Sequence, residues 1–293
     1  MGRLLDPRSI REYAGRIGLR PTKALGQNFV VDANTVRRIV ALGGVTGGDT
    51  VLEIGPGLGS LTLGLLGTGA SVTAVEIDPR LAGLLPATVA AHQPGAADRL
   101  RIVCSDALDL AAVPGPAPTR LVANLPYGVS VPVLLHMLEL SRSWRAGLVM
   151  VQLEVADRLV AAPGSRAYGV PSAKLAWYGT ARRVGTVPPG VFWPVPKVDS
   201  GLVGITRHGP PATSATRGQV FAVVDAAFSQ RRKMLRTALS GLAGGPAAAS
   251  AAVEAAGLDP TTRGERLGIG DFAAVAERLV AAGAGALRAG SRS

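Results

Sequence analysis

Between residues 50 and 153, runs of residues typical of β-strands alternate with runs typical of α-helices. This alternation constrains the fold strongly, because a strand that is followed by a helix and a parallel strand packs back onto the sheet in only one hand. The sequence therefore predicts an α/β fold with a doubly wound, mostly parallel sheet of Rossmann-like type. Strands are expected at 50–55, 71–78, 99–107, 119–124 and 146–153, and helices at 60–67, 79–92 and 130–140.

The pattern changes after about residue 206, where segments rich in Ala, Gly and Arg follow one another. We expect a first domain over residues 1–206, which begins with a basic segment, and a small α-helical domain over residues 207–293. Further helices are expected at 10–18 and 33–44, ahead of the first strand, and at 228–239 in the second domain.

Glycine or acidic residues stand at the carboxyl ends of three predicted strands, the edge at which open α/β sheets bind ligands. Gly55, Gly57 and Gly59 follow the first strand, and glycine lets the backbone turn tightly and approach a ligand. Glu76 ends the second strand, where a carboxylate can accept both hydroxyls of a ribose. Asp106 ends the third and is placed to accept a hydrogen bond from an adenine amino group. Alone, such a glycine loop fits nicotinamide, flavin and methyl-donor enzymes, and a lone carboxylate also serves as a helix cap.

A fourth strand ends in the residues Asn124, Leu125, Pro126 and Tyr127. Proline has no N–H group to donate to a sheet, so Asn124 is expected to end the strand and to lie in a turn. Two interpretations stay open from these residues alone. One is a plain strand exit with a packed tyrosine, and the other is a ligand-binding turn.

The net charge of +11 is unevenly distributed along the chain. Residues 1–38 carry eight basic and three acidic residues, and residues 201–293 carry eleven and six. Residues 39–120 carry four basic and seven acidic residues. An acidic block between basic ones indicates a central site that prefers a cationic ligand and flanks that bind a polyanion. The simpler interpretation is the arginine-rich composition common in proteins from GC-rich genomes.

Cysteine, histidine and hydropathy patterns argue against several kinds of site. Cys104 is the only cysteine and the three histidines are widely spaced, so we expect neither a disulfide nor a metal site. No apolar run reaches the ~18 residues of a membrane span, and the charged N-terminus lacks the apolar core of a signal peptide. We expect a cytoplasmic monomer without a membrane partner.

Nine blocks of the sequence together resemble the bacterial small-subunit (16S) ribosomal RNA adenine N6,N6-dimethyltransferases, the actinobacterial members in particular. They occur in order from about residue 20 to about residue 275. The N-L-P-Y block is typical of N6-adenine methylation, and the other blocks narrow the resemblance to the ribosomal RNA dimethylases. The blocks are LGQNFVVD, VLEIGPGLGSLT, VTAVEID, SDAL, NLPYGVSVP, MVQLEVADRL, PGSRAYGVPS, FWPVPKVDSGLV and AFSQRRKMLR.

This resemblance implies a class I methyltransferase fold, S-adenosyl-L-methionine as cofactor, and transfer of methyl groups to N6 of two adjacent adenines. In this scheme the Asn124 side-chain oxygen and a backbone carbonyl of Leu125 or Pro126 accept the two N–H groups of the adenine. Tyr127 stacks on the extruded base, and Phe192 lies across it. The cofactor contacts that we expect are Gln27, Asn28, Val30, Gly55, Gly57, Glu76, Ile77, Asp106, Ala107 and Asn124.

The implied partner is the 3′-terminal hairpin of 16S rRNA within immature small ribosomal subunits. Phosphate contacts are expected from the basic run in the second domain and from a basic patch near the N-terminus, although a charged run is more often just a solvated surface. The residues expected to contact RNA are Arg20, Lys23, Arg231, Arg232, Lys233 and Arg236, with Arg37 and Arg38 beside the N-terminal patch.

Two departures from the family pattern bear on substrate preference. Gly128 stands where the family often has Asn, and Arg266 stands where it usually has a small hydroxyl residue. Three other functions remain to be distinguished: a large-subunit (23S) adenine methylase of the macrolide-resistance type, a mainly non-catalytic ribosome-assembly factor, and, more distantly, a nicotinamide dehydrogenase.

Overall fold

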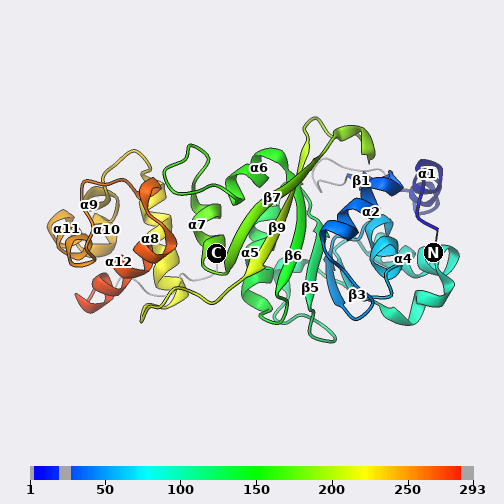
Figure 1. The fold of residues 1–293 in the computed structure, drawn as a ribbon, viewed down its shortest axis with the longest axis horizontal. Helices are drawn as coiled ribbons and strands as arrows, with labels where there is room; N and C mark the ends of the chain where they lie inside the picture. Colours follow the sequence, from blue (N-terminus) through cyan, green and yellow to red (C-terminus); the bar gives the residue numbers. More distant parts are fainter. Residues whose placement is uncertain (1–2, 20–27, 285–293) are drawn as a thin grey trace. The chain divides into compact units, whose positions relative to one another are not determined.

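The computed structural model describes residues 3–19 and 28–284, which divide into two compact units (Figure 1). The first unit comprises residues 1–157 and 180–207, and the second comprises residues 158–179 and 208–293. The division at 207/208 lies one residue from the predicted boundary. Residues 158–179 belong to the second unit, whereas the prediction included them in the first domain. Their helix α7 (Val170–Ala176) packs against α8 (Arg217–Ser229) of the second unit.

The first unit is built on a seven-stranded sheet with the order β4-β3-β2-β5-β6-β9-β7. Its first five strands are parallel, and β9 runs antiparallel to β6, so the predicted doubly wound, mostly parallel sheet is confirmed. The central strands are continuous apolar runs because helices cover both faces of such a sheet. The strands are β2 (Thr50–Ile54), β3 (Ser71–Glu76), β4 (Leu100–Cys104), β5 (Arg120–Asn124), β6 (Ala146–Gln152), β7 (Gly179–Val187) and β9 (Ser200–Arg207).

Capping side chains fix where the helices of the first unit begin. Asp6 accepts a hydrogen bond from the Ser9 N–H, and Asp32 accepts one from the Thr35 N–H. Asp78 caps its helix through the Arg80 N–H, directly before a proline in the first turn. The helices are α1 (Pro7–Arg16), α2 (Ala33–Leu42), α3 (Ser60–Leu66), α4 (Pro79–His92), α5 (Ser130–Leu140) and α6 (Leu153–Leu159), with short 3₁₀ turns η1 (Pro94–Arg99), η2 (Ala107–Asp109) and η3 (Pro189–Val191).

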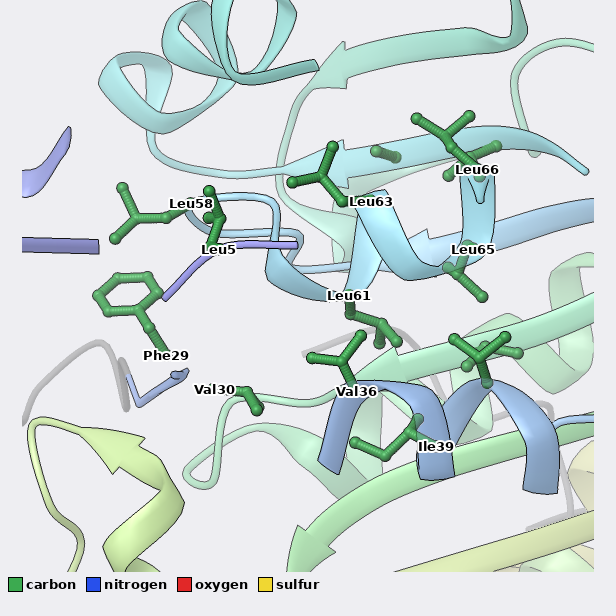
Figure 2. Close-up of a cluster of buried hydrophobic side chains, with 14 of the residues drawn as sticks. Leu5, Phe29, Val30, Val36, Ile39, Leu58, Leu61, Leu63, Leu65 and Leu66 are labelled. Carbon is green, nitrogen blue, oxygen red and sulfur yellow. The ribbon is translucent and has the colours of Figure 1, made fainter. Parts of the chain in front are cut away.

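Apolar side chains of α2, α3 and the sheet form one continuous core (Figure 2). Val36 of α2 lies near Leu61 of α3, Ile39 and Leu65 belong to the same cluster, and all four side chains are buried. Their spacing of three or four residues places each pair on one helix face, so burial of these faces holds both helices against the sheet.

A two-stranded ribbon joins two segments that are far apart in the sequence. Strand β1 (Phe29–Val30) pairs antiparallel with β8 (Phe192–Trp193), with Phe29 opposite Trp193 and Val30 opposite Phe192. The rings of Phe29 and Trp193 stack with centroids 6.2 Å apart. The ribbon brings the LGQNFVVD and FWPVPKVDS blocks into contact.

The second unit is helical around an aromatic cluster of Tyr168, Phe228 and Phe272. The predicted helix at 228–239 is wrong, because α8 ends at Ser229 and the next helix begins only at Leu235. Between them, Met234 pairs antiparallel with Arg263, which draws the chain out of the helical path. The remaining helices are α9 (Leu235–Ala238), α10 (Ser240–Ala243), α11 (Pro246–Ala255) and α12 (Ile269–Ala281), with η4 (Gly264–Arg266). Within the described residues, no helix is long and apolar enough to cross a membrane.

Candidate active site

A pocket lies at the carboxyl ends of β2, β3, β4 and β5 in the first unit. Each of the four strand ends contributes one of the features expected from the sequence: the glycine loop, Glu76, Asp106 and Asn124. Parallel strands place their carboxyl ends at the same edge of a sheet, which is why residues distant in sequence meet here.

The glycine loop turns so tightly that its first two glycines take left-handed backbone angles. Gly55 has φ of 70° and Gly57 has φ of 57°, a region that side chains other than glycine rarely adopt. At Gly57 a second constraint applies, since a Cβ atom there would lie 2.7 Å from the Phe29 ring. Phe29 of the β1–β8 ribbon therefore packs directly against the loop, and glycine is required at residue 57 on both counts.

Glu76 is held by two backbone N–H groups. Its Oε2 accepts a hydrogen bond of 3.0 Å from Gly57 N–H, and its Oε1 accepts one of 3.0 Å from Asp78 N–H. Burial raises the pKa of this carboxyl, while the two N–H groups lower it. Each oxygen keeps a second lone pair, so the oriented carboxylate remains able to accept ligand hydroxyls.

Next to Glu76, the pocket offers apolar surface beside a carboxylate. Ile77 is 53% exposed and Leu108 is 38% exposed, and both line the pocket with the buried Ala107. Asp106 accepts a hydrogen bond of 2.9 Å from Leu108 N–H through Oδ1. Large exposed apolar side chains beside a fixed hydrogen-bond acceptor suit a flat heterocycle with an amino group. Leu108 was not expected from the sequence.

The turn after β5 presents two acceptors. The Asn124 amide donates from Nδ2 to the Asn28 carbonyl at 3.0 Å, which leaves its Oδ1 without a partner among the described residues. The Pro126 carbonyl accepts from Val129 N–H at 3.2 Å, whereas the Leu125 carbonyl accepts from no N–H group of the described residues. Of the two backbone carbonyls left open by the sequence, that of Leu125 is the free one.

Tyr127 lines the same pocket and is anchored through its hydroxyl, which lies 2.7 Å from the Ser200 hydroxyl. Burial raises the pKa of Tyr127, and the bond to Ser200 lowers it. At neutral pH the phenol is therefore uncharged and serves as a flat apolar face.

The sequence-predicted cofactor residues from Asn28 onward all line this pocket, as do Asn124, Leu125, Pro126 and Tyr127. Phe192 does not: its side chain is 2% exposed and belongs to the core, where β8 pairs with β1. In this structure Phe192 supports the ribbon, and its position across the base stays a prediction. Gln27, Arg20 and Lys23 lie outside the described residues.

Glu53 and Ser60 are two further pocket residues that were missed in the sequence. Glu53 of β2 is 1% exposed, and its Oε2 accepts a hydrogen bond of 2.7 Å from the Thr62 hydroxyl. Ser60 is 7% exposed, and its hydroxyl has no partner in the part of the chain that the structure describes. A carboxylate inside an apolar strand, two residues before the glycine loop, was the available signal for Glu53.

The predicted RNA-contacting residues of the second unit lie on a turn, which we call the basic turn (residues 230–234), and at the start of α9. Arg231 is engaged within the protein: its Nε donates to Glu265 at 2.9 Å and its Nη2 donates to the Arg166 carbonyl at 2.8 Å. The side chains of Arg232 and Lys233 are exposed and make no ion pair with the described residues. Arg236 is exposed and lies near Asp259. In the first unit, Arg38 donates to the Thr186 carbonyl at 2.9 Å, and Arg37 is exposed.

The charges of the pocket indicate what kind of ligand fits it. Three carboxyl groups line it, those of Glu53, Glu76 and Asp106, and no Lys, Arg or His is found among its described lining residues. Such a pocket favours a ligand that carries positive charge. Across the described ranges, no cluster of three or more His, Cys, Asp or Glu side chains is arranged to hold a metal ion.

Comparison with known proteins identifies the chain. Residues 19–280 match the family described as "Ribosomal RNA adenine dimethylase". The chain belongs to the ribosomal RNA adenine dimethylase family. As a member of this family, it is an S-adenosylmethionine-dependent ribosomal RNA adenine dimethyltransferase with a class I methyltransferase fold, and the cationic cofactor fits the charge of the pocket.

Relatives of this dimethylase are found among actinobacteria. A protein of Cutibacterium acnes named "Ribosomal RNA small subunit methyltransferase A" is 67% identical over 286 residues, which is 96% of each chain. A protein of the same name from Streptomyces coelicolor is 59% identical, with 94% of this chain and 97% of the relative covered.

Solved structures share the fold at lower identity. A dimethyladenosine transferase from Plasmodium falciparum superposes with a TM-score of 0.69 at 20% identity and covers 83% of this chain and 94% of that one. The 23S rRNA methyltransferase ErmE has a TM-score of 0.62 at 26% identity and covers 86% of this chain and 99% of that one.

Proposed function

We propose that this dimethylase transfers methyl groups to the N6 amino groups of two adjacent adenines in the 3′-terminal hairpin of 16S rRNA, within immature small ribosomal subunits. The relatives at 59% to 67% identity carry a small-subunit name, whereas the large-subunit enzyme ErmE is 26% identical. This contrast supports the small subunit over the large one as the substrate.

The orientation of the Asn124 amide is the observation that carries the proposal. With Nδ2 committed to the Asn28 carbonyl, Oδ1 is left to accept an N–H group from the adenine. The Leu125 carbonyl is the second acceptor, because that of Pro126 is already used in the turn. Two acceptors hold both N–H groups and favour the pyramidal, partly positive nitrogen that develops as a new bond forms.

The other residues of the turn hold the base. Tyr127 provides a stacking face, which contributes roughly 1–3 kcal/mol per base in nucleic-acid complexes. S-adenosyl-L-methionine supplies the methyl group as an electrophilic sulfonium, so no strong base is required in the protein. The chain's own task is alignment, and the departing proton leaves from a nitrogen that becomes acidic once alkylated.

Phosphate contacts from Arg232, Lys233 and Arg236 in the second unit complete the proposed RNA interaction. RNA of this kind is recognised by shape and by unpaired bases, so cations serve to anchor the backbone. Arg231 is assigned a supporting role, because Glu265 and the Arg166 carbonyl hold its guanidinium.

Mass spectrometry for N6,N6-dimethyladenosine tests the proposal after the protein has been incubated with immature small subunits and S-adenosylmethionine. Primer extension across both ribosomal RNAs then locates the modified bases, with Asn124→Ala as the inactive control. We expect stops at two adjacent adenines of 16S rRNA only. A stop in 23S rRNA would favour the large-subunit function, and binding without methylation would favour an assembly factor.

A further inference from the structure

Glu53 is a buried carboxyl with one oxygen left unbonded at the pocket. Its Oε2 accepts from the Thr62 hydroxyl, which is itself fully buried, and its Oε1 has no hydrogen-bond partner among the described residues. The side chain contributes to the lining of the pocket although it is 1% exposed. The unbonded oxygen therefore belongs to the wall of the pocket and is almost closed to bulk water.

Close to Glu53, the described surroundings supply no counter-charge. Glu76 on the adjacent strand β3 is the charged group that interacts with it, and Asp106, two residues after the end of β4, is the third carboxyl group of the pocket. From α3, Thr62 donates to Glu53, and Ser60, which lines the same pocket, has a buried hydroxyl without a partner among the described residues. A carboxylate in such surroundings is costly unless a cation is present.

The protonation of Glu53 follows from these neighbours. Burial raises the pKa of Glu53 and the charge of Glu76 raises it further, while the Thr62 hydrogen bond lowers it, with a net value of about 8. At neutral pH the carboxyl of the empty pocket is therefore mostly protonated. A nearby positive charge would reverse this preference, because an opposite charge favours the ionised form.

We propose that Glu53 distinguishes the cofactor from its product by charge, releasing its proton when the sulfonium ligand binds and holding it when the pocket contains the neutral sulfide. Methyl transfer breaks the S–CH₃ bond with its electron pair left on sulfur, so S-adenosylmethionine carries one more positive charge than S-adenosylhomocysteine. The proton that Glu53 regains comes from solvent. The proposal rests on S-adenosylmethionine being the cofactor.

Glu53 would then favour replacement of the product by the cofactor in the pocket. A cationic ligand meets an ionised Glu53 and gains an ionic contact, while the product leaves a buried carboxylate uncompensated until it takes up a proton. The pocket therefore prefers the cofactor to the product, and the preference depends on pH. Below about pH 8 the cofactor must displace a proton, so its relative affinity falls as pH falls.

Calorimetric titration of both ligands into the intact protein tests this between about pH 6 and about pH 9. We expect the ratio of S-adenosylmethionine to S-adenosylhomocysteine affinity to rise by up to about tenfold per pH unit and to level off above about pH 8. Repeating the titration in buffers of different ionisation enthalpy should show proton release for S-adenosylmethionine only.

Two variants distinguish the titration of Glu53 from that of neighbouring groups. Glu53→Gln keeps an acceptor for the Thr62 hydroxyl but does not titrate, and it should make the ratio independent of pH and lower it about tenfold at pH 8. Thr62→Val keeps the carboxyl but removes the hydrogen bond that lowers its pKa, so the levelling-off should move to higher pH. Asp98→Asn, an exposed carboxylate outside this pocket, is the matched control.

Each result supports or overturns the proposed role of Glu53. A flat ratio in the unsubstituted protein, or a full pH dependence retained in Glu53→Gln, would overturn the proposal, and the latter would assign the titration to Glu76. If the unsubstituted protein binds neither ligand, the cofactor assignment fails as well. Should Glu53→Gln not fold, as judged by its melting temperature, the shift in Thr62→Val alone carries the test.

Discussion

The hydroxyl of Tyr127 lies 2.7 Å from the hydroxyl of Ser200, whose side chain is completely buried at the start of β9. This bond joins the turn after β5 to the only antiparallel neighbour of β6 within the sheet as described. It anchors the hydroxyl end of the tyrosine ring beside the pocket. Ser200, the last residue of the FWPVPKVDS block, thereby holds the tyrosine of the N-L-P-Y turn.

Ser200→Ala should therefore weaken the positioning of the target adenine without affecting the cofactor. Loss of one neutral hydrogen bond predicts a decrease of about 3- to 12-fold in kcat/KM for the RNA. Tyr127→Phe should lose the same amount, and the double variant no more than either one. Unchanged methylation in Tyr127→Phe would show that the bond does not position the ring.

Asn124→Ala should abolish methyl transfer while cofactor affinity stays within about tenfold, because the amide acts mainly on the transition state. Asn124→Asp is the sharper variant, since it keeps an acceptor but replaces the donor to the Asn28 carbonyl with a second oxygen. We expect it to be inactive too. Single-turnover methylation measures both, and a rate near that of the unsubstituted protein would rule out this mechanism.

Glu76→Ala should weaken binding of S-adenosylmethionine by about 1.5–3 kcal/mol, the range for hydrogen bonds to a charged group. Glu76→Gln should lose less, because its one carbonyl oxygen can still accept a backbone N–H of the pair now bonded to the carboxylate. Calorimetry distinguishes the two variants. Equal affinity in all three proteins would remove Glu76 from the cofactor site.

Arg232→Ala/Lys233→Ala should flatten the plot of log affinity for small subunits against log salt by about 1.5, since each phosphate contact contributes roughly 0.7–0.9 to the slope. Arg231→Ala is the matched comparison and should change the slope less, because Glu265 already neutralises its charge. Filter binding over a series of salt concentrations gives the slopes. If Arg232 and Lys233 are merely solvated, the slope will not move.

Asp49 should make the protein sensitive to strong acid. Burial raises its pKa, but hydrogen bonds from Thr119, Thr46 and Arg120 lower it more, to about 2. A carboxyl with a lowered folded-state pKa stabilises the fold above its ordinary value of 3.8, and this stabilisation is lost as pH falls toward 2. We expect a loss of about 2 kcal/mol across that window relative to Asp49→Asn, measured by urea unfolding. Parallel curves for the two proteins would contradict it.

The sequence predicted the order of strands and helices well where burial is continuous. The parallel strands β2, β3, β5 and β6 are largely buried, mostly apolar runs, and their ends carry most of the strand-end residues that line the pocket. Strand β7 was not predicted, because it lies at an edge and carries exposed residues such as Arg182 and Arg183. Charged edges protect a sheet from aggregation but hide the strand from a hydrophobicity pattern.

Contacts between distant segments account for what the sequence could not predict. The interruption between α8 and α9 depends on the backbone pairing of Met234 with Arg263. The residues around 230 give no sign of this pairing. Phe192 is an aromatic residue of the kind that stacks on bases, and its burial becomes evident only from the pairing of its strand with Val30. In the sequence Glu53 is simply one residue of a strand, and its role at the pocket is evident only from the hydrogen bond that it accepts from Thr62.

The pairing of β1 with β8 also has a consequence for synthesis on the ribosome. Phe29 and Val30 form one wall of the cofactor pocket, but their partner strand lies more than 160 residues later in the chain, at Phe192 and Trp193. A nascent chain can assemble β2 to β5 as they emerge, yet that wall lacks its partner until β8 has left the exit tunnel. The enzyme that modifies ribosomes thus gains a finished cofactor site only late in its own translation.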